Sequence, residues 1–282
     1  MLSAALMMCA TDAAGKWAMI DGNVVMLNFF RGGIAVLILL PLSMREGGLR
    51  AFTTRRPVAH LLRCALLITL AFSWFLALDA MPLADAAGIA LCAPLCMTAM
   101  AVWFLGERVD ASRWGAVVVG FVGMVLIIRP GSDVFHWVTL LPAWAAVGYA
   151  AYMVSNRGLR QTETVTALTL YPQLAVFVFA AALLPWFWTP VSTATVIVMC
   201  MTGVFAAAGH LLLTYAFRFA PPSVLAPLDY TALVWEIAFG LLIFGDWPAP
   251  LVWGGMALIV AAGLFIIYRE TMSTRAENAP AT

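Results

Sequence analysis

Three charged residues interrupt apolar sequence near the N-terminus: Asp12 and Lys16 in the first apolar segment and Arg31 in the second. The spacing of four residues places Asp12 and Lys16 on one face of a helix. Charges buried in a bilayer are costly, so the three are expected to converge between the first two helices. They form either an ion network that fixes helix packing or a cationic patch, balanced by Asp12, that binds an anionic or carboxylate-bearing substrate. Outward snorkelling of Lys16 and proton coupling through Asp12 are further alternatives.

The second half of the chain carries a different set of ionisable residues. His210 lies in the eighth apolar segment, and Asp229 and Glu236 lie in the ninth, seven residues apart on one helical face. His210 and Asp229 form either a hydrogen-bonded pair that stabilises a helix contact or a proton relay. Glu236, with no basic residue near it in sequence, is the best single candidate for a protonatable group.

Several aromatic residues lie deep within apolar segments. Each either packs in the core or stacks on a planar substrate ring. The candidates for substrate contact are Trp74, Trp103, Tyr149, Tyr152, Tyr230 and Trp235.

The composition identifies the surroundings of these residues. The 282-residue chain is 64% hydrophobic and only 10% charged, which excludes an ordinary soluble domain and indicates an integral membrane protein. A net charge of +1 gives no reason to expect a nucleic-acid partner. The five cysteines lie in apolar segments and are interpreted as packing residues, and no metal site or cofactor is expected.

Ten apolar runs, each about 20 residues long, are separated by short polar turns. The predicted fold is therefore all-α, with ten transmembrane helices and short loops that force neighbouring helices together. The predicted spans are 2–20, 25–44, 58–78, 84–105, 112–129, 135–155, 165–185, 194–217, 223–245 and 250–268.

The arginines predict the orientation of these spans. With a cytoplasmic N-terminus, twelve of the fifteen basic residues fall on the cytoplasmic side and only Arg129 falls in an outer loop. This positive-inside bias predicts a multi-pass protein of the inner (plasma) membrane with both termini in the cytoplasm.

The two halves of the chain repeat each other at an offset of 139 residues. Residues 77–107 align with 216–246 without gaps, and Trp114-Gly115 aligns with Trp253-Gly254. The offset spans five helices, an odd number, so the second copy enters the membrane from the opposite side. The prediction is two inverted five-helix repeats, residues 1–131 and 132–270, followed by a disordered cytoplasmic tail, 271–282. Inverted repeats are a recurrent plan of transporters that work by alternating access.

Short motifs add a family resemblance. The repeat ends FLGE (104–107) and FGD (244–246), with prolines opening the fourth and ninth spans, resemble the EamA branch of the drug/metabolite transporter superfamily. DAAGKW (12–17) and NFFRGG (28–33) are similar to the subgroup that includes S-adenosylmethionine and riboflavin uptake carriers. The resemblance implies a central cavity lined by the first four spans of each half.

The leading hypothesis is therefore a transporter of small organic metabolites, including uptake of S-adenosylmethionine or a related planar or zwitterionic compound. Alternatives are an exporter of amino acids or toxic compounds, a channel, and a membrane-embedded lipid-modifying enzyme, although no catalytic motif is present. The expected partners are a small-molecule substrate and the lipid bilayer. Helix-borne glycines fit a monomer and a homodimer equally well.

Overall fold

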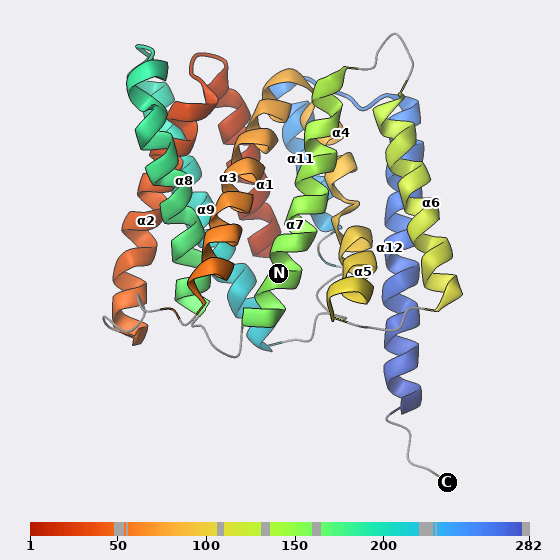
Figure 1. Cartoon of the computed structure of the whole chain (residues 1–282). Coiled ribbons are helices and arrows are strands. Elements are labelled where there is room, and N and C mark those ends of the chain that lie inside the picture. The colour runs from red at the N-terminus through yellow and green to blue at the C-terminus, as the bar shows by residue number, and fades with distance from the viewer. Residues whose placement is uncertain are drawn as a thin grey trace.

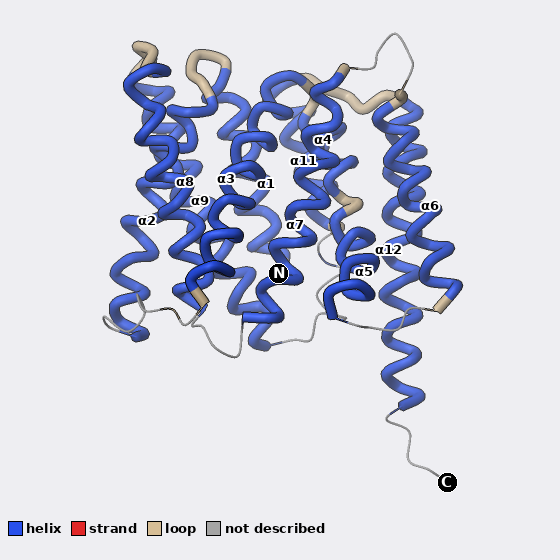
Figure 2. Tube along the Cα trace, viewed as in Figure 1, coloured by secondary structure: helices blue, strands red, loops and turns tan. Residues whose placement is uncertain are grey.

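The computed structural model describes residues 1–47, 54, 56–105, 110–130, 136–159, 165–219, 228 and 230–277. Within these ranges every regular element is a helix (Figure 2). The elements are α1 (Leu2–Met19), α2 (Val24–Gly47), α3 (Pro57–Ala80), α4 (Leu83–Ala90), α5 (Ala93–Leu105), α6 (Ala111–Ile128), η2 (Trp137–Thr139), α7 (Leu140–Leu159), α8 (Val165–Phe187), α9 (Thr193–Phe219), α11 (Thr231–Phe239), η3, a π-turn (Gly240–Phe244), and α12 (Pro250–Glu277). The all-α prediction is confirmed for the described residues.

Among the described residues, eight helical segments are long and apolar enough to cross a membrane, judged by length and composition. α11 with η3 forms a shorter apolar segment, Thr231–Phe244. α1 falls outside this set although it has 18 residues, and it is the helix that carries Asp12 and Lys16. The chain is a multi-pass helical membrane protein, and α1 carries two charged residues within its 18-residue length.

Two predicted segments differ from the structure in detail. The bounds of the predicted span 84–105 agree with the apolar segment Leu83–Phe104, but the helix within it is broken into α4 and α5 at Leu91 and Cys92. Pro94 lacks the N–H that would bond the carbonyl of Ala90, and the Cys92 N–H bonds Ile89 O at 3.1 Å in a tighter turn. At the other end α12 continues to Glu277, so residues 271–277 of the predicted disordered tail are helical.

The helices pack in pairs that are distant in sequence (Figure 1). α2 packs on α8 at one side of the bundle, and α6 packs on α12 at the other. Between these pairs, α1 contacts α9 and α11, while α3 contacts α7 and α8. α4 contacts α7 and α11, and α1 also contacts α2, α3 and α4, so α1 is surrounded by other helices.

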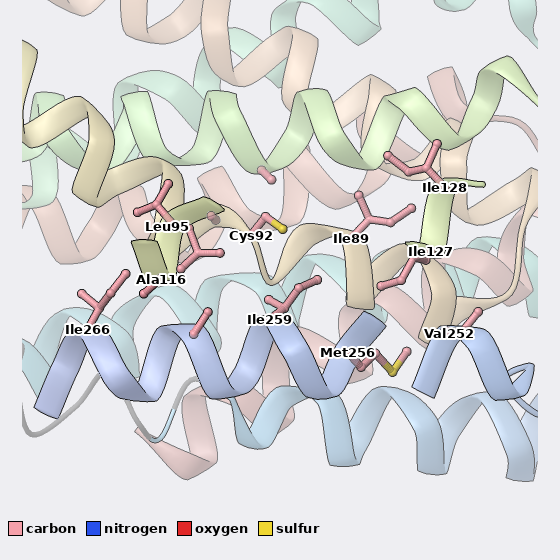
Figure 3. Close-up of a cluster of buried hydrophobic side chains, with 14 of the residues drawn as sticks. Ile89, Cys92, Leu95, Ala116, Ile127, Ile128, Val252, Met256, Ile259 and Ile266 are labelled. Carbon is pink, nitrogen blue, oxygen red and sulfur yellow. The ribbon is translucent and has the colours of Figure 1, made fainter. Parts of the chain in front are cut away.

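The largest apolar core lies where the α4–α5 break meets the α6–α12 pair (Figure 3). Its buried side chains include Ile89, Cys92, Leu95, Ile127 and Ile259. Buried side chains in a protein interior pack about as densely as molecules in an organic crystal. This core joins the α6–α12 pair to the rest of the bundle.

Glycines bring α6 and α12 into backbone contact. A Cβ on Gly123 would lie 2.7 Å from the carbonyl oxygen of Gly255, and a Cβ on Gly255 would lie 2.6 Å from that of Gly123. Gly115 and Gly254, in contrast, have nothing within 4 Å of an added Cβ. The first two glycines therefore serve packing within the bundle, whereas the second two lie on an open face.

The same pair of helices is joined at one end by a carboxylate. Asp110 caps the N-terminus of α6, and its Oδ2 accepts a hydrogen bond of 2.7 Å from Nη2 of Arg269 on α12. The Arg269 guanidinium, assisted by the Ser112 hydroxyl, lowers the pKa of the Asp110 carboxyl to about 2.

Asp110→Asn is expected to lower the thermal stability of the protein slightly, with a defined pH dependence. A carboxyl whose pKa is depressed in the folded state stabilises that state above its unfolded pKa, 3.8. The contribution is lost as the pH falls from about 4 through about 2. Melting curves of the native chain and the variant should therefore differ at neutral pH and coincide near pH 2. A difference that is independent of pH would contradict this assignment.

Candidate substrate and proton site

A buried cluster of ionisable side chains forms where α1, α2, α3 and α11 meet. Asp12 on α1 accepts a hydrogen bond of 2.8 Å at Oδ1 from Nε1 of Trp74 on α3. Arg31 on α2 lies close enough to Asp12 to attract it electrostatically, and its Cζ is 5.5 Å from the centre of the Phe75 ring. Nη2 of Arg31 donates to Oδ1 of Asn28 on the same helix at 3.2 Å, and the predicted convergence of Asp12 and Arg31 on a shared substrate stays a prediction.

Glu236 on α11 completes the cluster. It is 3% exposed, it lies close enough to Asp12 to interact with it electrostatically, and its Oε2 has no hydrogen-bond partner in the described part of the chain. Two carboxylates accept hydrogen bonds but cannot donate them, so Asp12 and Glu236 could bond each other only with a proton on one of them. The structure therefore places two carboxyl groups and one cation, Arg31, on neighbouring helices.

Small residues on α1 make this convergence possible. A Cβ on Gly15 would overlap the Phe75 ring, so glycine lets α3 approach α1 closely at this level. The Phe75 ring, 2% exposed, then lies between α1 and the guanidinium of Arg31. Asp12 itself is half-buried and keeps some exposed surface, whereas Arg31 and Glu236 are buried.

Lys16 does not join the cluster, contrary to the prediction that all three charges converge. Its Nζ donates to the carbonyl oxygens of Leu78 at 2.9 Å and Met81 at 2.5 Å, at the C-terminal end of α3. It also lies 5.3 Å from the centre of the Phe244 ring. A cation at a helix C-terminus interacts favourably with the helix dipole and the last carbonyls, and the long lysine side chain reaches them.

The structure describes only one of the two residues of the predicted relay, His210. His210 lies on α9, half-buried and close enough to Arg31 to interact with it electrostatically. Asp229 lies outside the described residues. The relay stays a prediction.

The aromatic candidates separate into different surroundings. Trp74 belongs to the cluster through its hydrogen bond to Asp12. Trp235, which precedes Glu236 in the sequence, is half-buried on α11. Tyr230 packs against Gly263 of α12, where an added Cβ would overlap its ring. Tyr149 packs on the α6–α12 core, Tyr152 lies under Arg63, and Trp103 is 73% exposed on α5.

Arg63 is the functional candidate that sequence reasoning missed. It was counted with the arginines of the cytoplasmic side, but it is 3% exposed within α3 and contacts α7 and α8. The signal was available, because Arg63 lies inside an apolar span, where an ionisable residue is a functional candidate by default.

The fold and the site together define a class of protein. Apolar helices enclose a buried arginine and a buried glutamate, and such intramembrane groups mark the pathways of solutes and ions. This arrangement is that of a membrane transporter.

The chain belongs to the EamA-like transporter family. The profile of that family matches residues 1–129. A riboflavin transporter of Rhizobium johnstonii is 34% identical over 256 residues, which cover 90% of this chain and 83% of that protein. An S-adenosylmethionine uptake transporter of Rickettsia bellii is 29% identical over 264 residues, covering 93% of this chain and 89% of that protein. The family predicted from the short motifs is confirmed.

A riboflavin transporter of Vibrio cholerae is 29% identical over 283 residues, covering 99% of this chain and 95% of that protein. Among solved structures, a crystal structure matches with a TM-score of 0.66 at 18% identity, covering 99% of this chain and 98% of that chain. This likeness shows the fold over the whole length. The named relatives support a membrane metabolite transporter.

Proposed function

We propose that this protein carries a small organic metabolite across the inner membrane by alternating access, with both termini in the cytoplasm. The observation that carries the proposal is the buried cluster of Asp12, Arg31 and Glu236, because charges in a bundle core need a functional or structural partner. The relatives named for riboflavin and S-adenosylmethionine make planar or zwitterionic metabolites the first candidates.

Helix contacts support ten transmembrane helices arranged as two inverted repeats. Leu70 of α3 packs on Gly148 of α7. Adding 139 to 70 and subtracting 139 from 148 gives Gly209 of α9 and Cys9 of α1, and Gly209 packs on Met8, the neighbour of Cys9. The same shift turns the contact of Gly120 with Ala262 into that of Ile259 with Gly123, which also occurs. Contacts that recur after the halves are exchanged are those expected of a pseudo-two-fold axis.

Two unsatisfied groups favour a substrate that carries both charges. Nε of Arg31 and Oε2 of Glu236 are buried and have no hydrogen-bond partner in the described part of the chain. A carboxylate would accept from Arg31, and an ammonium or sulfonium group would lie against the two acidic residues. Trp74, already oriented by Asp12, offers a ring face to a planar group.

The acidic pair also supports proton coupling. A proton held between Asp12 and Glu236 can leave when a cationic substrate group arrives or when the site faces the other side of the membrane. Coupled carboxylates release their protons in steps that belong to the pair as a whole.

The function is tested with purified protein in lipid vesicles, using radiolabelled S-adenosylmethionine and riboflavin as probes. A transporter gives saturable uptake and counterflow of at least one probe. Flux that rises linearly with concentration indicates a channel instead, and an absence of flux for both probes contradicts the proposed substrate class.

Arg31→Ala is expected to reduce uptake of the transported probe by at least about tenfold, because truncating one member of a buried charge pair leaves its partner unpaired. Arg45→Ala, on the same helix but exposed, is the matched control and should transport normally. Arg31→Lys keeps the charge but loses the planar donor pattern, so intermediate uptake is expected. Size-exclusion chromatography confirms folding, and normal uptake by folded Arg31→Ala would remove Arg31 from the site.

A further inference from the structure

A second buried cation lies away from the proposed substrate site. Nη1 of Arg63, on α3, donates to Oγ of Ser155 on α7 at 3.0 Å, and Nη2 donates to the carbonyl oxygen of Leu168 on α8 at 3.1 Å. Its Cζ lies 4.3 Å from the centre of the Tyr152 ring. All these partners belong to the second half of the chain, so Arg63 joins the two halves.

The backbone of α8 explains why the Leu168 carbonyl can accept these bonds. In an α-helix that carbonyl would bond the N–H four residues later, but residue 172 is proline. The freed oxygen accepts from Arg63 and also from the hydroxyl of Tyr152 at 3.4 Å. Ser155 in turn donates to the Tyr152 carbonyl at 2.6 Å, which orients its oxygen toward Arg63. The acceptor site is therefore built into the helix by Pro172.

This junction lies at one end of the bundle. Arg63 is near the start of α3, Ser155 near the end of α7 and Leu168 near the start of α8, at the end from which α12 projects (Figure 1). His60, one turn earlier on α3, packs edge-on against Tyr171 of α8, with ring centres 4.9 Å apart. Buried aromatic and polar groups thus close the contact between α3 and α8 at this level.

At the opposite end the described residues join the two halves without a cation: Nδ2 of Asn23 donates to the carbonyl oxygen of Phe187 at 2.8 Å, and Oγ1 of Thr195 donates to Oδ2 of Asp21 at 3.0 Å. The 139-residue offset relates Arg63 to Thr202 and Ser155 to Lys16. Thr202 donates to Met199 on its own helix, and Lys16 donates to α3, within its own half. The junction between the halves is therefore fastened by a cation at one end and not at the related position of the other end.

We propose that Arg63 is a gating residue: its junction with α7 and α8 closes one end of the transport pathway and separates when the site opens there. The inference rests on the proposed alternating access. Arg63 is bound here by a hydroxyl, a carbonyl and a ring face. When the junction opens, water replaces these partners and hydrates the guanidinium, so both arrangements satisfy the charge.

A native cysteine reports on this junction. Cys64 is half-buried, next to Arg63, and close enough to Tyr152 to interact with it electrostatically. The experiment measures alkylation of Cys64 by a charged maleimide, with the full chain in lipid nanodiscs and without substrate. Cys200 on α9, also half-buried, is the internal reference, and Cys64→Ser identifies the labelled site.

Arg63→Gln is expected to increase the alkylation rate of Cys64 by about tenfold or more, because a sparsely populated open state becomes a major one. The rate at Cys200 should not change. Tyr152→Phe, which removes one hydroxyl from the junction, should increase the Cys64 rate less. Arg63→Lys, with one point charge in place of a fork, should fall between native protein and Arg63→Gln.

Three results would overturn the inference. One is an alkylation rate of Cys64 in folded Arg63→Gln that equals the rate in the native protein. Another is equal acceleration at Cys64 and Cys200, because that marks general loosening. If Arg63→Gln does not fold, an unchanged alkylation rate of Cys64 in Tyr152→Phe overturns the inference. None of these results depends on flux, so an absence of uptake by the native chain counts against the proposed function alone.

Discussion

Glu236→Gln is expected to abolish proton-driven accumulation of substrate while leaving counterflow intact. Glutamine has the shape of protonated glutamate and, like it, can donate a hydrogen bond, but it cannot release a proton. One coupled proton and a gradient of one pH unit supply free energy for about tenfold accumulation. Vesicles with the variant should equilibrate the probe and not concentrate it.

Asp79→Asn serves as the matched control, because Asp79 is an exposed carboxylate near the end of α3. It should accumulate the probe as the native chain does. If Glu236→Gln still concentrates substrate along a pH gradient, the acidic pair does not couple transport to protons. Loss of both counterflow and accumulation would instead assign Glu236 to substrate binding.

Gly123→Ala is expected to destabilise the protein by about 1 to 3 kcal/mol, the usual cost of overpacking. The new Cβ would meet the backbone oxygen of Gly255 at 2.7 Å, and a backbone atom cannot move aside without shifting α12. The transition should appear at lower temperature in thermal unfolding of the detergent-solubilised protein.

Gly115→Ala is the control on the same helix, since nothing lies within 4 Å of its added Cβ. Replacing an open helical glycine by alanine is expected to be neutral or stabilising, by up to about 1 kcal/mol. Equal destabilisation by both changes would mean that the Gly115 face is covered, as a homodimer contact would require. A harmless Gly123→Ala would contradict the close α6–α12 contact.

Hydropathy was sufficient to predict most helices, because burial in lipid leaves a simple run of apolar residues. It did not predict the break between α4 and α5, which depends on whether the bundle tolerates the carbonyl that Pro94 leaves without a donor. The length of α12 was also missed, since its last turns are polar and carry no apolar signal.

Side-chain direction explains the successes and failures at the site. Sequence reasoning grouped Asp12 with Arg31 because both are charges within apolar spans, but it did not predict their hydrogen-bond partners, Trp74 for Asp12 and Asn28 for Arg31. Lys16 was misplaced because the carbonyls that attract it belong to α3, whose C-terminal end is brought beside it only by folding. Arg63 was misread for a similar reason, since its acceptor depends on Pro172 in another helix.

The projection of α12 beyond the other helices has a practical consequence (Figure 1). From Arg269 to Glu277 a helix advances about 12 Å at 1.5 Å per residue. A fluorescent domain joined directly after this segment would be carried on a stiff rod, not on a loose tether. Energy transfer from that domain to dyes in the lipid should then report a narrow range of separations.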